Sequence, residues 1–280
     1  LHNRKHSFPT RRSSDLEEKD SDKLNNFLLE LSNEDRVWIV SNLDHDYYEN
    51  FMQLLEPKVG AQILYSLSDT QARDFLQTAD PEKAAAIADE LQSDFRADII
   101  GGMNAVSTEA VLKLMSPEEA EDVKELIDYA PTTAGGLMIT EYLYYTKKMT
   151  IREIIKDMQD NGEYYANFMI QYAYIVSEKE ELLGVLPIRD MLFTNMNKTA
   201  EEVMIKNPIH VNANTELAEL ERIFDKKKFF GIPVVNHKDQ LVGVLRGAAV
   251  EEAIASKANQ TLLKLSGIIG GEELRTMGLS

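Results

Sequence analysis

The chain changes its character at one short stretch, which reads Asp128-Tyr129-Ala130-Pro131-Thr132-Thr133-Ala134-Gly135-Gly136-Leu137-Met138-Ile139-Thr140-Glu141. Pro131 has no amide proton and clashes with the turn before it, so a helix ends ahead of it. The paired glycines allow backbone conformations and close approaches that a Cβ atom forbids. Helical spacing dominates before this stretch, and strands alternate with helices after it. We therefore predict a hinge between two domains at residues 131–141.

Composition limits the classes of protein to consider. The 280 residues, 44% of them hydrophobic, suffice for two modest cores. The absence of cysteine excludes disulfides and thiolate metal sites and leaves carboxylates as the expected metal ligands. The formal charge of −17, from 47 acidic and 30 basic residues, disfavours nucleic acid as a partner and favours cations. No window approaches the roughly 18 apolar residues that span a bilayer, so we expect a soluble chain.

Residues 1–16 are basic in an otherwise acidic chain and show no apolar periodicity. They also lack the apolar core of a signal peptide. We expect this tail to be disordered or foreign to the protein; the alternative is a basic tail that touches the acidic body.

Residues 17–130 carry helix-start signatures about every 12 residues. A Ser or Asp before a helix accepts hydrogen bonds from its free amides, and Pro at the first helical position is pre-set for the turn. The signatures begin at Ser32, Asp44, Glu56, Ser68, Asp80, Ser93, Ser107 and Ser116. No unit this short can bury its apolar face alone, so we predict a superhelical, α-solenoid-like stack of short helices with Trp38 in its core.

An internal repeat follows the hinge. Glu181-Leu182-Leu183-Gly184-Val185-Leu186 matches Gln240-Leu241-Val242-Gly243-Val244-Leu245 at an offset of 59 residues, and each copy follows an apolar strand and a polar turn. A duplicated unit ordered strand, helix, strand, strand, helix predicts an α/β tandem whose copies pack with pseudo-symmetry. The expected limits are 142–198 and 199–255, with a connecting helix and truncated end over 256–280.

Local signals place the elements of this tandem. Thr150 and Thr199 are expected helix caps, and a helix is expected to begin at Asp190. The predicted strands cover residues 142–145, 169–176, 182–186, 208–211, 230–235 and 241–245. The other predicted helices cover residues 151–159, 200–204, 215–226 and 248–265.

The strand, turn, Leu-x-Gly-Val-Leu and following helix resemble a tandem pair of CBS domains. The helical repeats, joined through Ala134-Gly135-Gly136-Leu137-Met138, resemble the amino-terminal domain of MgtE-type magnesium channels. This resemblance runs from about Leu24 to Leu265 and implies an α plus α/β fold. It implies the cytosolic sensor of a dimeric channel, in which Mg²⁺ bridges acidic domain faces and holds a closed state. It further implies a homodimer through the CBS domains and a membrane pore that this chain lacks, so that the chain senses but does not conduct.

The resemblance also carries over candidate metal ligands. Asp94 and Asp98, at i and i+4, present two carboxylates on one helix face, and Gly136 falls where the family offers a backbone carbonyl. Glu216 and the backbone of Asp225 match a further cluster. Other acidic positions of the family hold Gln62, Ala218, Lys228, Ala249, Lys257, Gln260 and Thr261. Because a charged lysine cannot bind Mg²⁺, the region of Asp94, Asp98 and Gly136 is the best supported site.

Two alternative functions remain open. CBS tandems also bind adenine nucleotides such as ATP, with an Asp at the start of the last helix taking the ribose hydroxyls; Asp190 stands there in the first copy and Ala249 in the second. Pro187 replaces the Ser or Thr usual three residues earlier, and an acidic residue at a helix start needs no ligand. A docking scaffold that binds neither ligand is the third hypothesis. No His-x-x-x-His, phosphate-loop or Gly-x-Ser-x-Gly pattern indicates an enzyme.

Overall fold

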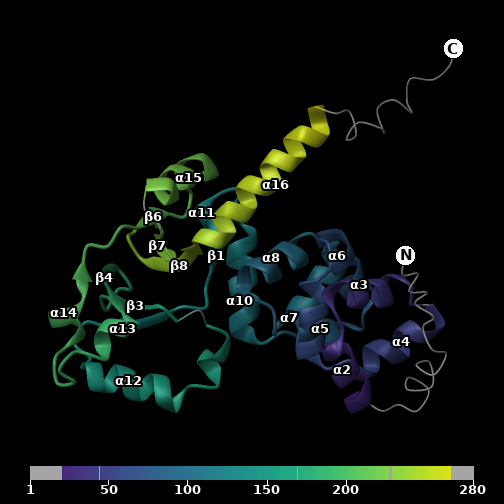
Figure 1. The fold of residues 1–280 in the computed structure, drawn as a ribbon, viewed down its shortest axis with the longest axis horizontal. Coiled ribbons are helices and arrows are strands. Elements are labelled where there is room, and N and C mark those ends of the chain that lie inside the picture. The colour runs from purple at the N-terminus through teal and green to yellow at the C-terminus, as the bar shows by residue number, and fades with distance from the viewer. Residues whose placement is uncertain (1–20, 44, 169, 227–228, 266–280) are drawn as a thin grey trace, which may run out of the picture. The chain divides into compact units, whose positions relative to one another are not determined.

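The computed structural model describes residues 21–43, 45–168, 170–226 and 229–265. The chain divides into two compact units, residues 1–125 and 126–280 (Figure 1). The predicted tail 1–16 and the last part of the predicted connecting helix, residues 266–280, lie outside the described residues. No helix within the described ranges has the length and apolar character needed to cross a membrane.

Short helices build the first unit. They are α2 (Ser21–Glu30), α3 (Asn33–Ser41), α4 (His45–Leu54), α5 (Pro57–Leu64), α6 (Asp69–Thr78), α7 (Pro81–Ala88), α8 (Ser93–Gly101), α9 (Ala105–Leu112) and α10 (Pro117–Ile127), which crosses the unit boundary. Ser32, Ser68 and Asp80 cap α3, α6 and α7 as predicted. Ser107 does not start a helix, because the Asn104 side chain caps α9 by accepting the Ser107 amide.

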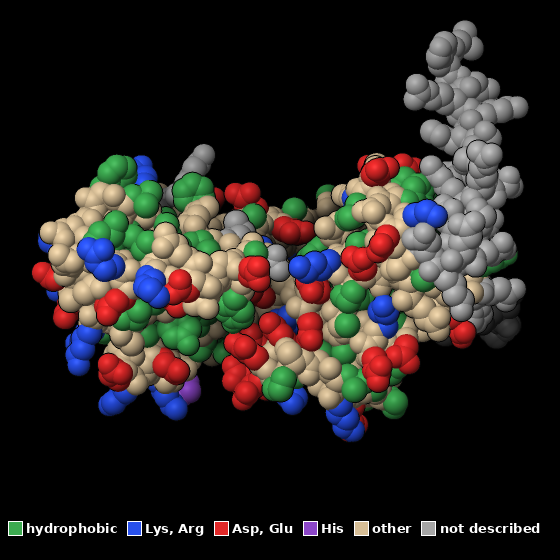
Figure 2. All heavy atoms as spheres, turned by 90° about the horizontal axis from the view of Figure 1, so that it is seen from below, with side chains coloured by type: hydrophobic (Ala, Val, Ile, Leu, Met, Phe, Trp, Pro, Cys, Tyr) green, Lys and Arg blue, Asp and Glu red, His purple; other side chains and the backbone are tan. Residues whose placement is uncertain are grey.

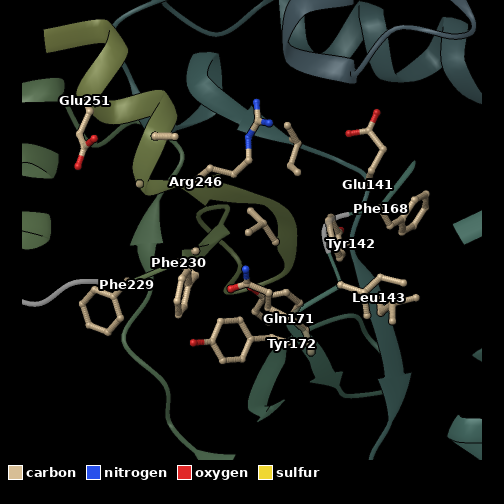
Figure 3. Close-up of a pocket in the computed structure, with 17 residues that line it drawn as sticks. Glu141, Tyr142, Leu143, Phe168, Gln171, Tyr172, Phe229, Phe230, Arg246 and Glu251 are labelled. Atoms are coloured by element: carbon tan, nitrogen blue, oxygen red, sulfur yellow. The ribbon is translucent and has the colours of Figure 1, made fainter. Parts of the chain in front are cut away.

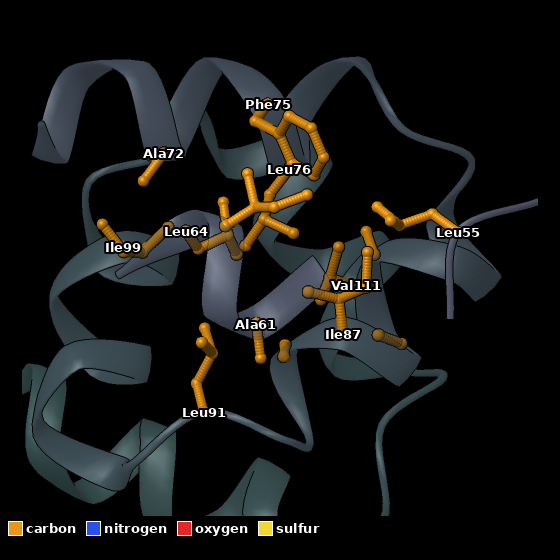
Figure 4. Close-up of a cluster of buried hydrophobic side chains, with 14 of the residues drawn as sticks. Leu55, Ala61, Leu64, Ala72, Phe75, Leu76, Ile87, Leu91, Ile99 and Val111 are labelled. Atoms are coloured by element: carbon orange, nitrogen blue, oxygen red, sulfur yellow. The ribbon is translucent and has the colours of Figure 1, made fainter. Parts of the chain in front are cut away.

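One continuous apolar cluster holds these helices together (Figure 4). Figure 4 shows Leu64, Leu76, Ile87 and Ile99 converging from four helices, and all four are fully buried. The prediction for Trp38 is wrong, since 51% of this residue is exposed. Helix α3 has no buried residue and packs only its partly buried apolar side chains against the cluster, so Trp38 falls on its outer side.

Helix α8 is anchored by a buried charge. Arg96 is only 1% exposed, and its guanidinium pairs with Glu119 of α10 and donates from Nη1 to the Leu91 carbonyl at 3.1 Å. A buried arginine is tolerable only when carboxylate and carbonyl groups replace the water it has lost. The pairing therefore fixes the helix that carries Asp94 and Asp98.

The second unit contains two four-stranded sheets, ordered β1-β8-β7-β6 and β2-β3-β4-β5. The strands are β1 (Met138–Ile139), β2 (Leu143–Thr146), β3 (Tyr172–Val176), β4 (Leu182–Pro187), β5 (Ile205–Lys206), β6 (Val211–Asn212), β7 (Gly231–Val235) and β8 (Leu241–Arg246). The helices are α11 (Ala134–Leu137), α12 (Ile151–Asp160), η1 (Tyr164–Asn167, 3₁₀), α13 (Ile188–Met191), α14 (Ala200–Val203), α15 (Leu217–Lys226) and α16 (Gly247–Leu265). Capping boxes at Thr150 and Thr199 agree with the sequence prediction.

The two copies exchange short segments. Strand β1 precedes the first copy but pairs antiparallel with β8 of the second, with Met138 opposite Leu245. Strand β5 lies in the leading segment of the second copy and pairs antiparallel with β4 of the first, with Ile205 opposite Val185. Each sheet therefore contains one short strand that comes from the leading segment of the other copy. The sequence did not predict β1, α11 or β5, because elements of two to four residues are too short to show periodicity.

Residues 131–141, predicted as a hinge, are hydrogen-bonded into the second unit. The amides of Ala134 and Gly135 donate to the Thr215 and Ala213 carbonyls at 2.9 and 2.7 Å. Sixty-six residues later, the amides of Ala200 and Glu201 donate to the Met149 and Lys147 carbonyls at 2.8 and 3.1 Å. The same pattern thus occurs twice, as the pseudo-symmetry of the tandem requires.

Close approaches explain the glycines of both motifs. A Cβ atom on Gly184 would lie 2.4 Å from the Met204 sulfur, and one on Gly243 would lie 2.5 Å from the Met138 sulfur. The glycine of each Leu-x-Gly-Val-Leu motif therefore makes room for the methionine of the exchanged segment. At Gly136 the obstacle is main chain, because a Cβ atom would lie 2.3 Å from the Ala130 carbonyl oxygen.

The copies differ in one connection. Eleven residues, 161–171, join α12 to β3, whereas four residues, 227–230, join α15 to β7. The longer connection contains η1 and is tied to α12 by the Asp157 carboxylate. Oδ2 of Asp157 accepts from the hydroxyls of Tyr145 and Tyr165 at 2.8 and 3.0 Å, and Oδ1 accepts from Asn161 Nδ2 at 2.8 Å.

We expect Gly136→Ala to destabilise the second unit by about 1–3 kcal/mol, because the main chain around Ala130 and Pro131 has to move to accept the methyl group. Chemical denaturation followed by circular dichroism measures this. The control is Gly162→Ala, whose Cβ atom would approach no atom closer than 3.6 Å. Equal stability of the two variants would contradict the close approach at Gly136.

Candidate metal and ligand sites

Helix α8 carries the predicted carboxylate pair. Asp94 lies in its first turn and Asp98 one turn later, so both project from the same side of the helix. Oδ1 of Asp94 accepts the Phe95 amide at 2.8 Å, and Asp98 is exposed to solvent. The structure therefore agrees with the prediction that one helix face presents both carboxylates.

The pKa of Asp98 is raised from its ordinary 3.8 to about 6. The protein packed around the carboxyl desolvates it, although the residue still reaches water, and this is the largest cause. The charges of Asp94 and Asp69 raise the pKa further, and Arg73 lowers it in part. At neutral pH the negative charge of Asp98 is thus in an unfavourable environment, and a nearby cation would stabilise it.

Sequence reasoning missed Asp69. This residue begins α6, a different helix from α8, yet its charge acts on Asp98. Only the packing of α6 against α8 brings the two together. The helix-start pattern at Ser68 located Asp69 on α6 but contained no signal for its neighbour on α8.

The other predicted metal residues lie in the second unit. Glu216 immediately precedes α15 and forms an isolated antiparallel bridge with Thr133, which caps the helix that contains Gly136. Asp225 lies nine residues beyond Glu216, which is about 13 Å along the helix. Magnesium holds its ligands at about 2 Å, so Glu216 and Asp225 cannot share one ion within this chain. Whether Gly136 joins Asp94 and Asp98 stays a prediction.

Metal ligands are sparse in the described part of the chain, where no group of three or more His, Cys, Asp or Glu side chains could hold an ion. Mg²⁺ commonly keeps several waters and binds through one or two carboxylates, so the Asp94 and Asp98 pair suits this ion better than a metal that needs a full protein cage. Figure 2 shows acidic side chains gathered in several groups on one face, with Lys and Arg between them.

Asp190 is exposed on α13, directly after β4, with its carbonyl accepting the Thr194 hydroxyl at 2.8 Å. It does not line a cavity of about 280 Å³ that lies in the same unit. That cavity lies at the equivalent place in the second copy, beside Gly247 and Ala248 at the start of α16 (Figure 3). We call it the aromatic cleft, because its lining includes Tyr142, Phe168, Tyr172, Phe229 and Phe230.

The fold defines a two-part protein, a stack of short helices joined to a duplicated α/β tandem with exchanged strands. Comparison with known families gives the same division. Residues 31–132 match the family described as MgtE intracellular N domain, and residues 134–195 and 200–255 each match the CBS domain.

Curated relatives of this chain include magnesium transporters. The magnesium transporter MgtE of Thermus thermophilus is 28% identical over 155 residues, which are 55% of this chain and 34% of the relative. The MgtE of Enterococcus faecalis is 25% identical over 154 residues, or 54% and 33%. This chain therefore spans about a third of the length of these curated relatives.

Two solved structures share the fold over most of this chain. The cytosolic domain of the Mg²⁺ channel MgtE in complex with ATP has a TM-score of 0.74 and 26% identity, covering 86% of this chain and 97% of that one. The soluble part of a magnesium transporter has a TM-score of 0.75 and 22% identity, covering 88% and 96%. The chain combines the MgtE intracellular N domain with a CBS pair and so belongs to the MgtE family, and over most of its length it resembles the cytosolic domain of the Mg²⁺ channel MgtE.

The raised pKa of Asp98 predicts how stability depends on pH. Because the folded state binds the proton more tightly than the unfolded state, stability falls as pH rises from about 4 to about 6 and stays low above that. Asp98→Asn removes the cost of the ionised carboxylate and should stabilise the Mg²⁺-free protein at pH 7.5 by about 1 kcal/mol. This value is smaller than the pKa shift alone would give, because water screens the partly exposed charge.

Thermal unfolding at pH 4 and pH 7.5 measures this difference, and the gain should vanish at pH 4. The control is Asp74→Asn, because Asp74 is also an exposed aspartate and lies on α6 of the same unit. Stabilisation that is equal at both pH values would show that the charge of Asp98 is not its cause.

Proposed function

We propose that this chain is a Mg²⁺-responsive regulatory region of a magnesium channel or transporter, in which bound Mg²⁺ closes the region and thereby gates a membrane pore. The observation that carries the proposal is the carboxylate pair on α8. Partial burial and the charges of Asp94 and Asp69 raise the energy of the ionised Asp98 carboxylate. Membership of the MgtE family supports the choice of ion.

The physical mechanism is charge neutralisation. The chain carries a formal charge of −17, so its acidic faces repel one another and weaken compact arrangements. A hard divalent cation that prefers oxygen ligands cancels this repulsion where carboxylates gather. A low concentration of Mg²⁺ leaves the repulsion in place, and a high concentration removes it, which makes the region a sensor.

The partners follow from the same family. We propose that the chain acts as a homodimer through its CBS pair, at the cytoplasmic face of the membrane, and transmits its state to the pore domain of the full-length transporter. The proposed role is regulatory, and no reaction is assigned to the chain.

Small-angle X-ray scattering tests the magnesium response. We expect the radius of gyration to fall saturably as Mg²⁺ rises from zero to about 20 mM, and not with NaCl or KCl of equal ionic strength. The double variant Asp94→Asn with Asp98→Asn should need at least several-fold more Mg²⁺ for the same change, because it lacks the charged pair.

The matched control is Glu121→Gln with Glu125→Gln, an exposed i, i+4 carboxylate pair on α10 of the same unit. The proposal fails if monovalent salt reproduces the compaction. It also fails if the α8 and α10 double variants respond alike.

ATP binding at Asp190 is the second candidate function. The relative of 26% identity was solved in complex with ATP, and Asp190 stands at the helix start that takes ribose hydroxyls in CBS tandems. The two functions are compatible, since the carboxylate pair and Asp190 lie in different units.

ATP should raise the unfolding temperature of the wild-type chain in a concentration-dependent way, because a ligand that binds only the folded state stabilises it. Asp190→Ala should abolish most of this increase, because it removes the carboxylate that would bind the ribose hydroxyls. Differential scanning fluorimetry measures it, with Glu178→Gln, an exposed carboxylate after β3, as the control. An unchanged ATP response in Asp190→Ala would rule out this site.

A further inference from the structure

Helix α6 faces the carboxylate pair of α8 with one charge of each sign. The two helices pack against each other in the first unit (Figure 1). Asp69 begins α6 and Arg73 follows one turn later, so both project from the same side of that helix. The guanidinium of Arg73 stays charged at every pH at which the protein is folded. The surroundings of Asp98 therefore include a permanent positive charge from another helix.

Gly102 locates this guanidinium on the face of α8 that carries Asp98. Gly102 caps the end of α8 four residues after Asp98, so a side chain there would point to the same side of the helix. A Cβ atom on Gly102 would lie 2.5 Å from Cδ, 2.6 Å from Nε and 2.8 Å from Cζ of Arg73. The guanidinium of Arg73 thus covers the last turn of α8 on the side of Asp98.

The backbone gives no other reason for a glycine at this position. Gly102 has a φ of −86° and a ψ of −7°, a right-handed conformation that other residues also adopt. The missing side chain instead leaves room for Arg73, because even a methyl group would push the arginine aside. The glycine therefore keeps the positive charge close to the carboxylates.

Folding alone does not explain the charge of Arg73. The residue is half-buried, and none of the ion pairs in the described part of the chain includes it. Its Nε atom is buried without a hydrogen-bond partner among the described residues, which costs stability. A methionine of similar length would fill the same space without this cost. The guanidinium does act on α8, where it lowers the pKa of Asp98 against the opposing effect of Asp69.

We propose that Arg73 weakens Mg²⁺ binding at the Asp94 and Asp98 pair and so sets the ion concentration at which the region responds. The inference rests on the proposed magnesium function and adds a residue that determines affinity without binding the ion. A fixed guanidinium repels a divalent cation that approaches Asp98. Without it, the aspartates would bind Mg²⁺ more tightly, and the response would saturate at a lower concentration.

The test is a Mg²⁺ titration of the full chain and of Arg73→Met, followed by small-angle X-ray scattering. We expect the Mg²⁺ concentration at half of the compaction to fall about threefold to tenfold, because one unit charge beside a divalent ion is removed at a protein surface. Arg73→Lys keeps the charge, and since no bidentate contact is lost, its midpoint should stay within about twofold of the wild type. The difference between Arg73→Met and the wild type should shrink in about 0.5 M KCl, which screens the repulsion.

Lys58→Met is the matched control, because Lys58 is an exposed cation on α5 and is not among the charges that shift the pKa of Asp98. It changes the net charge of the chain by the same amount as Arg73→Met and should leave the midpoint unchanged. Circular dichroism verifies that the variants fold, and Arg73→Gln provides a second neutral side chain.

The outcomes separate this inference from the proposed function. The inference alone is overturned if the wild type responds to Mg²⁺ but the midpoint does not fall in Arg73→Met and Arg73→Gln. A fall that Lys58→Met reproduces, that Arg73→Lys shares, or that 0.5 M KCl leaves unchanged also overturns it. Flat curves for both the wild type and Arg73→Met overturn the proposed function together with the inference, whereas a response of Arg73→Met alone supports the role of Arg73.

Discussion

The CBS pair depends on the crossed exchange of two short segments between its copies. Main-chain hydrogen bonds of β1 with β8 and of β5 with β4 place one strand from the leading segment of each copy in the other copy's sheet. The turns meet at Glu181 and Gln240, where the Leu182 and Leu241 amides donate to the Asp239 and Glu180 carbonyls at 3.0 Å. Separating the copies would break all these bonds.

The helical unit is stabilised in a different way. Isolated helices this short are marginal in water, so α2 to α10 owe their stability to shared burial and to their caps. The apolar cluster of Figure 4 and the buried Arg96 and Glu119 pair supply the tertiary contacts. Asp94 and Asp98 thus project from a helix that the apolar cluster and the buried ion pair hold in place.

The two candidate sites have different chemistry because their surroundings differ. At α8, partial burial and neighbouring aspartates raise the energy of a negative charge, which favours a hard cation. In the aromatic cleft, aromatic rings, the Gln171 amide and charged side chains of both signs line a cavity of about 280 Å³. Part of the lining of the cleft comes from the connection 161–171, which is seven residues longer than its counterpart 227–230.

Local chemistry in the sequence determined much of this protein. Ser68, Asp80, Thr150 and Thr199 predicted helix starts because a cap acts over three residues. The repeated Leu-x-Gly-Val-Leu predicted the duplication, and the i, i+4 spacing placed Asp94 beside Asp98. Tertiary structure alone decided the strand exchange, the influence of Asp69 on Asp98, the exposure of Trp38 and the aromatic cleft. These features join residues far apart in the chain, and periodicity along one segment carries no information about which distant segment will pack against it.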